Sequence, residues 1–332
     1  MWINLIQILM SLALILISCE FFTNGIEWLG RKIGVGDGVV GSIFSAVGTC
    51  LPETMIPIIA ILFLGEDKKS VDVGVGAILG APFMLSTLAL FVVGVGVVLF
   101  RSRRGSMALN VNSDIVSRDI SFFIVAYSVG VTTAFINIRF IRVIVSAFLV
   151  ATYIYYIILT VRRDSVNHGY LDKLYLTKIL GFKNNVPDIL LQIGIALAGI
   201  IFGANVFVTN METVSEYIGI TPLILSLIVT PIVTELPEKF NSIIWIARKK
   251  DTLALGNITG AMVFQSCIPV SIGILATPWR LSSHIIVSSV MATLSAATVY
   301  FWIEDKGKLN LVPLFAGGAF YALFIVSLFI KG

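Results

Sequence analysis

Long apolar runs alternate with short polar stretches along the whole chain, and this pattern predicts a protein made of membrane-spanning helices. An α-helix needs about 20 apolar residues to cross the hydrocarbon core of a bilayer, and the runs reach that length. The first run starts at residue 1 without a charged stretch before it, so we expect a retained helix and not a cleaved signal peptide. We predict ten segments, near residues 4–29, 36–64, 71–100, 119–137, 140–161, 187–211, 220–247, 252–277, 282–303 and 309–330.

The longest polar stretch divides the chain and sets its predicted orientation. Residues 162–185 are predicted to be a cytoplasmic linker between a first domain, 1–161, and a second, 186–332. With the N-terminus outside, most of the 23 Lys and Arg residues fall in inner loops, as the positive-inside rule requires. Both termini are then expected outside, in a multi-pass protein of the cell (inner) membrane.

Composition supports this class and excludes others. The chain is 57% hydrophobic and 13% charged, with a mean hydropathy of +0.98, which is far more apolar than a soluble domain requires. The net charge of +4 comes without a basic stripe, so no nucleic-acid partner is expected. The expected partners are the lipid bilayer and inorganic cations, and no cofactor is predicted.

One short motif occurs twice, each time in the middle of an apolar run. Residues 48–53 read GTCLPE and residues 233–238 read VTELPE. The proline removes a helical hydrogen bond and leaves a carbonyl without its usual partner. A carboxylate at membrane depth is costly and is a functional-site hypothesis by default. The repeated pair therefore predicts a central ion site built from both halves of the chain.

Aligning the two Leu-Pro-Glu tripeptides extends the internal match. Residues 33–35 then coincide with 218–220, and a slightly different offset brings residues 76–81 onto 256–261. Each half holds five segments, an odd number, so the halves enter the membrane from opposite sides. The predicted fold is all-α: ten transmembrane helices arranged as two inverted five-helix repeats, with broken helices in segments two, three, seven and eight.

The motif residues are the oxygen donors that a hard divalent cation prefers. Ca²⁺ takes six to eight oxygens from carboxylates, carbonyls and water. Glu53 and Glu238 supply two carboxylates, and Thr49 and Thr234 add hydroxyl and carbonyl oxygens. Glu235 adds a third carboxylate three residues before Glu238, close to the same helix face.

The sequence around the first motif resembles the sodium/calcium exchanger (calcium/cation antiporter) superfamily, in its compact prokaryotic ten-helix form. Residues 40–53, VGSIFSAVGTCLPE, are similar to the family's G-T-S-L-P-E segment. The resemblance implies alternating-access exchange of a divalent cation, Ca²⁺ first, against another cation. It also implies that Glu53 and Glu238 hold the divalent ion with help from Thr49 and Thr234.

The chain departs from the family pattern at several positions, and those in segments three and eight help form the sodium sites in the family. Cys50 replaces a serine, and Glu235 replaces another in the second motif. Ala81 and Leu85 stand where the family has serine and asparagine. In the eighth segment Asn257 is kept, whereas Gln265 replaces an aspartate. The counter-ion is therefore left open between Na⁺ and H⁺.

Lys239, directly after the second motif, leaves three interpretations open. It can stand in place of a coupling cation and pair with Glu235 or Glu238. It can instead titrate together with the carboxylates and make the coupled ion a proton, or its ammonium can snorkel away from the site. The secondary site candidates are Cys50, Lys239, Gln265 and Asn257.

Two functions of other classes compete with transport. An intramembrane hydrolase would use Glu53 and Glu238 as a carboxylate pair, although neither an HExxH nor a Gly-x-Ser-x-Gly motif is present. A non-transporting cation sensor would signal through the linker at 162–185, which is short and holds no domain. We expect a transporter and not an enzyme.

Overall fold

The computed structural model describes residues 2–32, 50–65, 68–163, 173–181, 185–303 and 308–330. Within its helices, the side chains at 31, 161–163, 179–180, 233, 236–241 and 329–330 lie outside the description. The helices in chain order are α1 (Trp2–Lys32), α4 (Leu51–Leu62), α5 (Lys68–Met84), η2 (Leu85–Ala89), α6 (Leu90–Leu99), α7 (Arg101–Arg104), α8 (Ser113–Thr132), η3 (Thr133–Phe135), α9 (Arg139–Arg163), α10 (Tyr175–Leu180), α11 (Val186–Ile218), α12 (Pro222–Ala247), α13 (Asp251–Ala276), α14 (Ser283–Trp302) and α15 (Val312–Ile330). Two short strands, β1 (Leu109–Asn110) and β2 (Lys308–Leu309), pair antiparallel.

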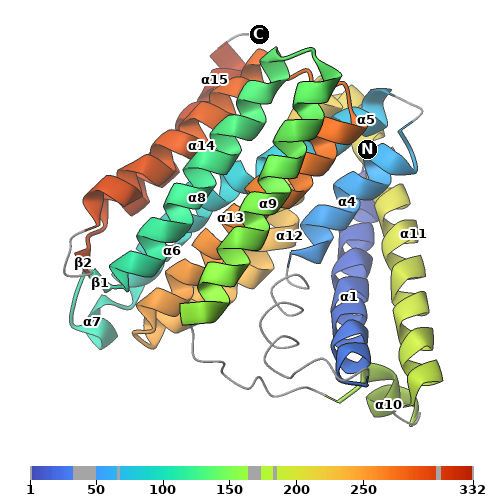
Figure 1. The fold of residues 1–332 in the computed structure, drawn as a ribbon, viewed down its shortest axis with the longest axis horizontal. Coiled ribbons are helices and arrows are strands. Elements are labelled where there is room, and N and C mark those ends of the chain that lie inside the picture. The colour runs from blue at the N-terminus through green and yellow to red at the C-terminus, as the bar shows by residue number, and fades with distance from the viewer. Residues whose placement is uncertain are drawn as a thin grey trace. The chain divides into compact units, whose positions relative to one another are not determined.

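Every predicted segment contains a helix, as Figure 1 lets the reader follow along the chain. Among the described residues, seven helical stretches are long and apolar enough to cross a membrane: 2–30, 68–99, 113–135, 139–160, 186–218, 251–276 and 283–302. Shorter apolar helical stretches cover 51–62, 222–232 and 312–328. The chain is therefore a multi-pass membrane protein, and the all-helical prediction is confirmed.

The described residues form two compact units that each draw on both halves of the sequence. The first unit holds residues 1–73 and 157–222, and the second holds 74–156 and 223–332. The domain boundaries expected from the sequence, which divide the chain at the linker, stay a prediction about the repeats.

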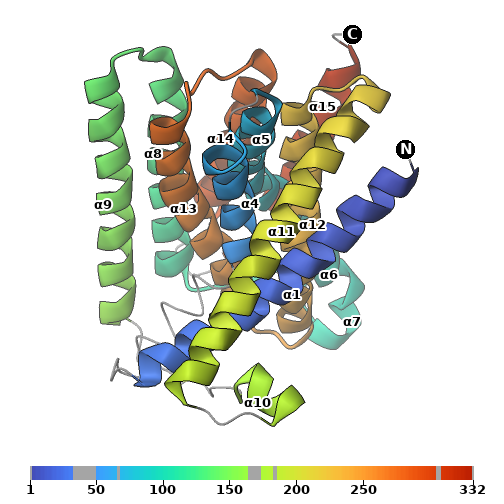
Figure 2. The same cartoon turned by 90° about the vertical axis from the view of Figure 1, so that its right-hand side faces the viewer.

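In the first unit, α1 and α11 lie side by side along most of their length, as both views show (Figures 1 and 2). The helices approach closely where α11 has glycine: a Cβ added at Gly203 would lie 2.8 Å from Ile15 Cγ1. Near the start of α11, the buried Gln192 amide donates to Phe21 O at 2.8 Å and accepts from Leu176 N at 2.9 Å. This amide ties α10, which lies in the predicted linker, to the α1–α11 pair.

In the second unit, α13 packs against α8 and against η2, and α14 packs against both α8 and α15. Buried polar side chains also form hydrogen bonds between neighbouring helices. Tyr127 donates its hydroxyl to Leu79 O at 3.1 Å, and the Trp279 indole donates to Gly130 O at 3.0 Å. These bonds fix the register of helices whose packing surfaces are otherwise apolar.

The structure differs from the expected helix breaks in segments seven and eight. Helix α12 runs without interruption from Pro222 to Ala247, and α13 runs from Asp251 to Ala276 with Pro269 inside it. A proline removes one hydrogen bond but leaves the neighbouring turns intact, so the helix continues. Segment three contains a real irregularity: the five-residue π-helix η2 follows Pro82. Segment two is described only from Cys50 onward, so its expected break lies outside the described residues.

Candidate functional site

Residues 51–53 of the first motif lie in the first turn of α4, and Glu53 is one of them. Cys50 is the N-cap residue, Pro52 lies in the first turn, and the Glu53 side chain is only 3% exposed. Proline suits this position because the first N–H groups of a helix have no helical acceptor. A carboxylate in the first turn also interacts favourably with the positive end of the helix dipole. The local sequence thus places a buried carboxyl group at the start of a helix within an apolar segment.

A second proline in α4 affects the backbone carbonyl group of Glu53. Pro57 lies inside α4, four residues after Glu53. It has no N–H to donate to the Glu53 carbonyl, which is the acceptor it would serve in a regular helix. Glu53 therefore presents a side-chain and a main-chain oxygen. Cys50 contributes differently: its carbonyl accepts the Thr54 hydroxyl at 2.7 Å, and its side chain is buried.

The second motif lies within α12 and buries a carboxylate that the family pattern lacks. Glu235 is 2% exposed. The neighbouring Thr234 is also buried and donates its hydroxyl to Thr230 O at 3.0 Å. This bond occupies the hydroxyl proton and leaves the oxygen able to accept or to coordinate.

Helix α13 carries two amide side chains with buried polar atoms. The Gln265 side chain is 1% exposed, and neither Nε2 nor Oε1 has a hydrogen-bond partner within the described part of the chain. The Nδ2 atom of Asn257 is also buried and has no hydrogen-bond partner among the described residues. Residues 257, 261 and 265 are spaced by four and share one helix face. Pro269 supplies no N–H to the Gln265 carbonyl, so this face holds main-chain as well as amide oxygens.

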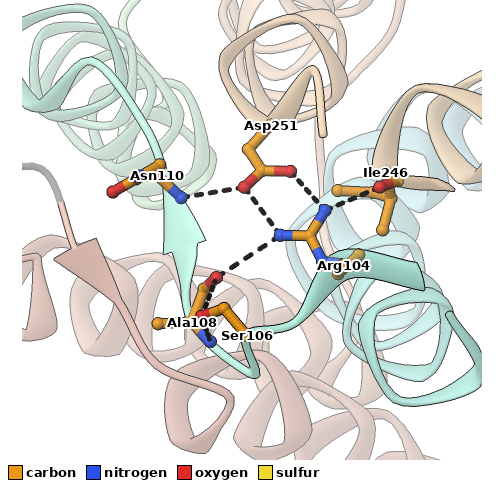
Figure 3. Close-up of polar contacts among 6 residues, drawn as sticks. All are labelled: Arg104, Ser106, Ala108, Asn110, Ile246 and Asp251. Carbon is orange, nitrogen blue, oxygen red and sulfur yellow. Dashed lines mark hydrogen bonds and ion pairs between the residues drawn. The ribbon is translucent and has the colours of Figure 1, made fainter. Parts of the chain in front are cut away.

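The turn between α12 and α13 is held by a buried ion pair, drawn in Figure 3. Arg104 donates through its two terminal nitrogens to both oxygens of Asp251, each at 2.7 Å. The same guanidinium donates to Ile246 O at 2.6 Å, and Asp251 also accepts from Asn110 N at 2.8 Å. One arginine thus joins the end of α12, the start of α13 and the β1 segment.

The predicted site residues that the structure describes are divided between the two units. Glu53 and Cys50 lie in the first unit, and Thr234, Glu235, Asn257 and Gln265 lie in the second. Thr49 and the side chains of Glu238 and Lys239 lie outside the described residues. Within the described ranges, no three His, Cys, Asp or Glu side chains cluster in a way that could hold a metal ion.

Sequence reasoning did not identify the buried carboxylates Asp119 and Asp251 or the spacing of Glu53 and Pro57. Asp119 is 1% exposed inside α8 and accepts the Thr259 hydroxyl at 2.8 Å. Thr259 lies 140 positions further along the chain, so the sequence does not indicate this contact. The spacing of Glu53 and Pro57, by contrast, is visible in the sequence and predicts an extra carbonyl at the site.

The apolar helices with carboxylates and amides buried inside them define a polytopic membrane protein of the ion-handling kind. Residues 3–162 and 189–332 match the sodium/calcium exchanger protein family. The match covers most of the chain, and the protein therefore belongs to this family of membrane transporters.

Related proteins and solved structures agree with the family. The inner membrane protein YrbG of Escherichia coli (strain K12) is 24% identical over 275 residues, which are 82% of this chain and 79% of that one. The fold is similar to that of the H⁺/Ca²⁺ exchanger CAX, with a TM-score of 0.71 and 16% identity over 98% of this chain and 82% of that one. It is also similar to the sodium-calcium exchanger NCX_Mj, with a TM-score of 0.54 and 20% identity over 98% of each chain. These likenesses confirm the predicted ten-helix, inverted-repeat fold.

Proposed function

We propose that the protein is a secondary-active antiporter that exchanges a divalent cation, Ca²⁺ in the first place, for protons by alternating access. The observation that carries this proposal is the burial of Glu53 and Glu235, at 3% and 2% exposure, inside apolar helices that bear a duplicated motif. Carboxylates in such surroundings are kept at a cost in stability and mark ion pathways.

The proposed ligands are oxygens from both copies of the motif. Glu53 and Glu238 are the primary carboxylates, and Thr49 and Thr234 add hydroxyl or carbonyl oxygens. The Glu53 carbonyl, which receives no hydrogen bond from Pro57, is a further donor in this proposal. Such a set suits Ca²⁺, which takes many oxygens in a flexible arrangement.

In this proposal the amides of α13 supply further, neutral oxygens. Asn257 and Gln265 share a helix face, and the buried Gln265 amide has no hydrogen-bond partner among the described residues. A coordinated cation would satisfy its oxygen, which is otherwise buried at a cost of about 1–3 kcal/mol. This supports a role for Gln265 as a ligand.

Protons are the proposed counter-ion because the chain lacks oxygens that sodium would need. Ala81 and Leu85 have no side-chain oxygen, and Gln265 is neutral where the family has an aspartate. Glu235 instead adds a carboxylate able to take up and release a proton in the membrane interior. Lys239 is proposed to pair with Glu235 or Glu238, in place of a bound cation.

The proposed setting is the inner membrane, with both termini outside and residues 162–185 in the cytoplasm. The relative YrbG is described as an inner membrane protein. Family membership favours transport over an intramembrane hydrolase. A cation sensor would bind Ca²⁺ without moving it, so flux separates the two functions.

The test is Ca²⁺ uptake into proteoliposomes under imposed gradients. We expect uptake driven by a pH gradient and little affected by Na⁺, with Mg²⁺ and Mn²⁺ compared in parallel and protein-free liposomes as the control. Uptake that requires a Na⁺ gradient would overturn the proton assignment. Binding of Ca²⁺ without any flux would overturn the antiporter and support the sensor.

A further inference from the structure

A buried carboxylate in α8 lies outside the predicted ligand set. Asp119 is 1% exposed within the apolar helix Ser113–Thr132. An ionisable side chain in a membrane-spanning helix is rare and costly, and it needs a specific reason to be kept. Its contacts give that reason.

The two carboxylate oxygens of Asp119 have different partners. Oδ1 accepts from Arg118 Nε at 3.2 Å and from the terminal nitrogen Nη2 at 3.0 Å. Oδ2 accepts the Thr259 hydroxyl of α13 at 2.8 Å. The Arg118 guanidinium also lies over the Tyr156 ring, 5.3 Å from its centre. The arginine thus compensates the charge, and the second oxygen remains committed to α13.

The bond reaches α13 within the segment that the internal repeat singles out. Thr259 lies between Asn257 and Gly260 in residues 256–261, GNITGA. At Gly260 an added Cβ would come within 3.4 Å of the Tyr156 hydroxyl, so α9 also approaches here. Both contacts engage the middle of this segment.

The face that Asp119 holds differs from the face that carries the amides. Residues 257, 261 and 265 share one face of α13. Each residue turns the helix by about 100°, so Thr259 points away from Asn257. A rotation of α13 about its axis would therefore strain the Asp119–Thr259 bond and displace the Asn257 and Gln265 amides together.

We propose that Asp119 is a positioning residue for cation binding: through Thr259 it fixes the rotation of α13 and so places the Asn257 and Gln265 amide oxygens. Hydrogen bonds to a carboxylate are short and strong, so this bond adds a directional constraint to the packing of α8 against α13. Ligand oxygens must be held to within about 0.5 Å, so a loosened α13 weakens binding. The inference rests on the proposed function and assigns one determinant of its affinity.

The test removes the hydroxyl and keeps the shape of the side chain. Thr259→Val is nearly isosteric, and Thr259→Ser is the matched control that keeps the donor. We expect Thr259→Val to raise the Ca²⁺ concentration for half-maximal uptake about tenfold. This change corresponds to the loss of one charge-assisted hydrogen bond. The maximal rate should change by less than about twofold, since the primary carboxylates remain. Thr259→Ser should behave as the wild type.

An unchanged half-saturating concentration in Thr259→Val would overturn the proposal, as would a loss of maximal rate alone. The double variant Asp119→Asn/Thr259→Val should be no worse than the more affected single variant, because both act through one bond. Additive effects would contradict the shared route. If Thr259→Val is not monodisperse, Thr259→Cys, a weaker donor, takes its place and is expected to give an intermediate shift.

A binding measurement separates this inference from the proposed function. The Ca²⁺-dependent rise in Tm of the detergent-solubilised protein reports binding without transport. If the wild type shows no flux, the antiporter proposal fails, and the Tm rise still tests Thr259→Val against Thr259→Ser. If the wild type transports and both variants match it in flux and in Tm rise, only the role of Asp119 fails.

Discussion

Arg104 and Asp251 form a bidentate ion pair in which both side chains are 3% exposed. Asp251 is the first residue of α13, and Arg104 also bonds to Ile246 O near the end of α12. The pair therefore fixes the turn between the helix that carries Glu235 and the helix that carries Gln265. Because both charges are out of water, each depends on the other for its compensation.

Removing one member of this pair should destabilise the protein strongly. We expect Arg104→Ala to lower the free energy of unfolding by about 3–5 kcal/mol, since Asp251 is left buried and uncompensated. The neighbouring Arg103 is exposed, so Arg103→Ala should have little effect and serves as the control. Thermal unfolding in detergent measures both; equal Tm values for the two variants would contradict a structural role for the pair.

Gly80 permits a close approach between α5 and α12. An added Cβ would lie 2.2 Å from Leu227 O, a backbone atom that cannot move aside cheaply. Gly80→Ala should therefore cost about 1–3 kcal/mol of stability through overpacking. Gly256→Ala on α13 meets nothing within 4 Å, and should be neutral or stabilising by up to about 1 kcal/mol because alanine favours the helix. The same loss of Tm in both variants would refute the packing argument.

Gln265 should be favourable for binding and unfavourable for stability. Gln265→Leu removes buried amide atoms that lack hydrogen-bond partners among the described residues, so Tm in the absence of Ca²⁺ should rise. Ca²⁺ affinity should fall because a ligand oxygen is lost. In contrast, the Gln192 amide is bonded to Phe21 O, Asn24 Oδ1 and Leu176 N. Gln192→Leu should therefore cost about 1–3 kcal/mol. A Gln265→Leu variant that loses stability and keeps its Ca²⁺ affinity would show that the amide is structural.

Glu235 should matter for proton coupling more than for Ca²⁺ binding. We expect Glu235→Gln to reduce Ca²⁺ uptake driven by a pH gradient and to preserve exchange of Ca²⁺ for Ca²⁺ across the same membrane. The reason is that the glutamine keeps an oxygen but cannot carry a proton. The measurement compares both modes in the same proteoliposomes. Parallel loss of both modes would assign Glu235 to the divalent ion itself.

The fold was predictable because its main signals are local. The apolar runs gave helices close to the expected positions, for example α14 at Ser283–Trp302 against a predicted 282–303. The breaks were less predictable: Pro269 leaves α13 continuous, while a π-helix follows Pro82. Whether a proline interrupts a membrane helix depends on neighbours that satisfy the freed groups, and sequence periodicity carries no such information.

The site was predictable in part for a related reason. The duplicated tripeptide marks Glu53 from the sequence alone, and the structure buries it. The pairing of Asp119 with Thr259 and that of Arg104 with Asp251 join residues far apart in the chain. In the sequence, Arg104 belongs to a basic loop and Asp119 to the polar end of a segment. Only tertiary packing distinguishes them from ordinary surface charges.

The most direct test of the central claim, that Glu53 and Glu238 bind the transported ion, is Ca²⁺ uptake into proteoliposomes by Glu53→Gln and Glu238→Gln under a pH gradient. Glutamine keeps the size of the side chain and removes the charge, so uptake by either variant should fall to the level of protein-free liposomes. The Ca²⁺-dependent rise in Tm should disappear as well. Near-normal uptake by both variants, with the protein correctly folded, would contradict the account.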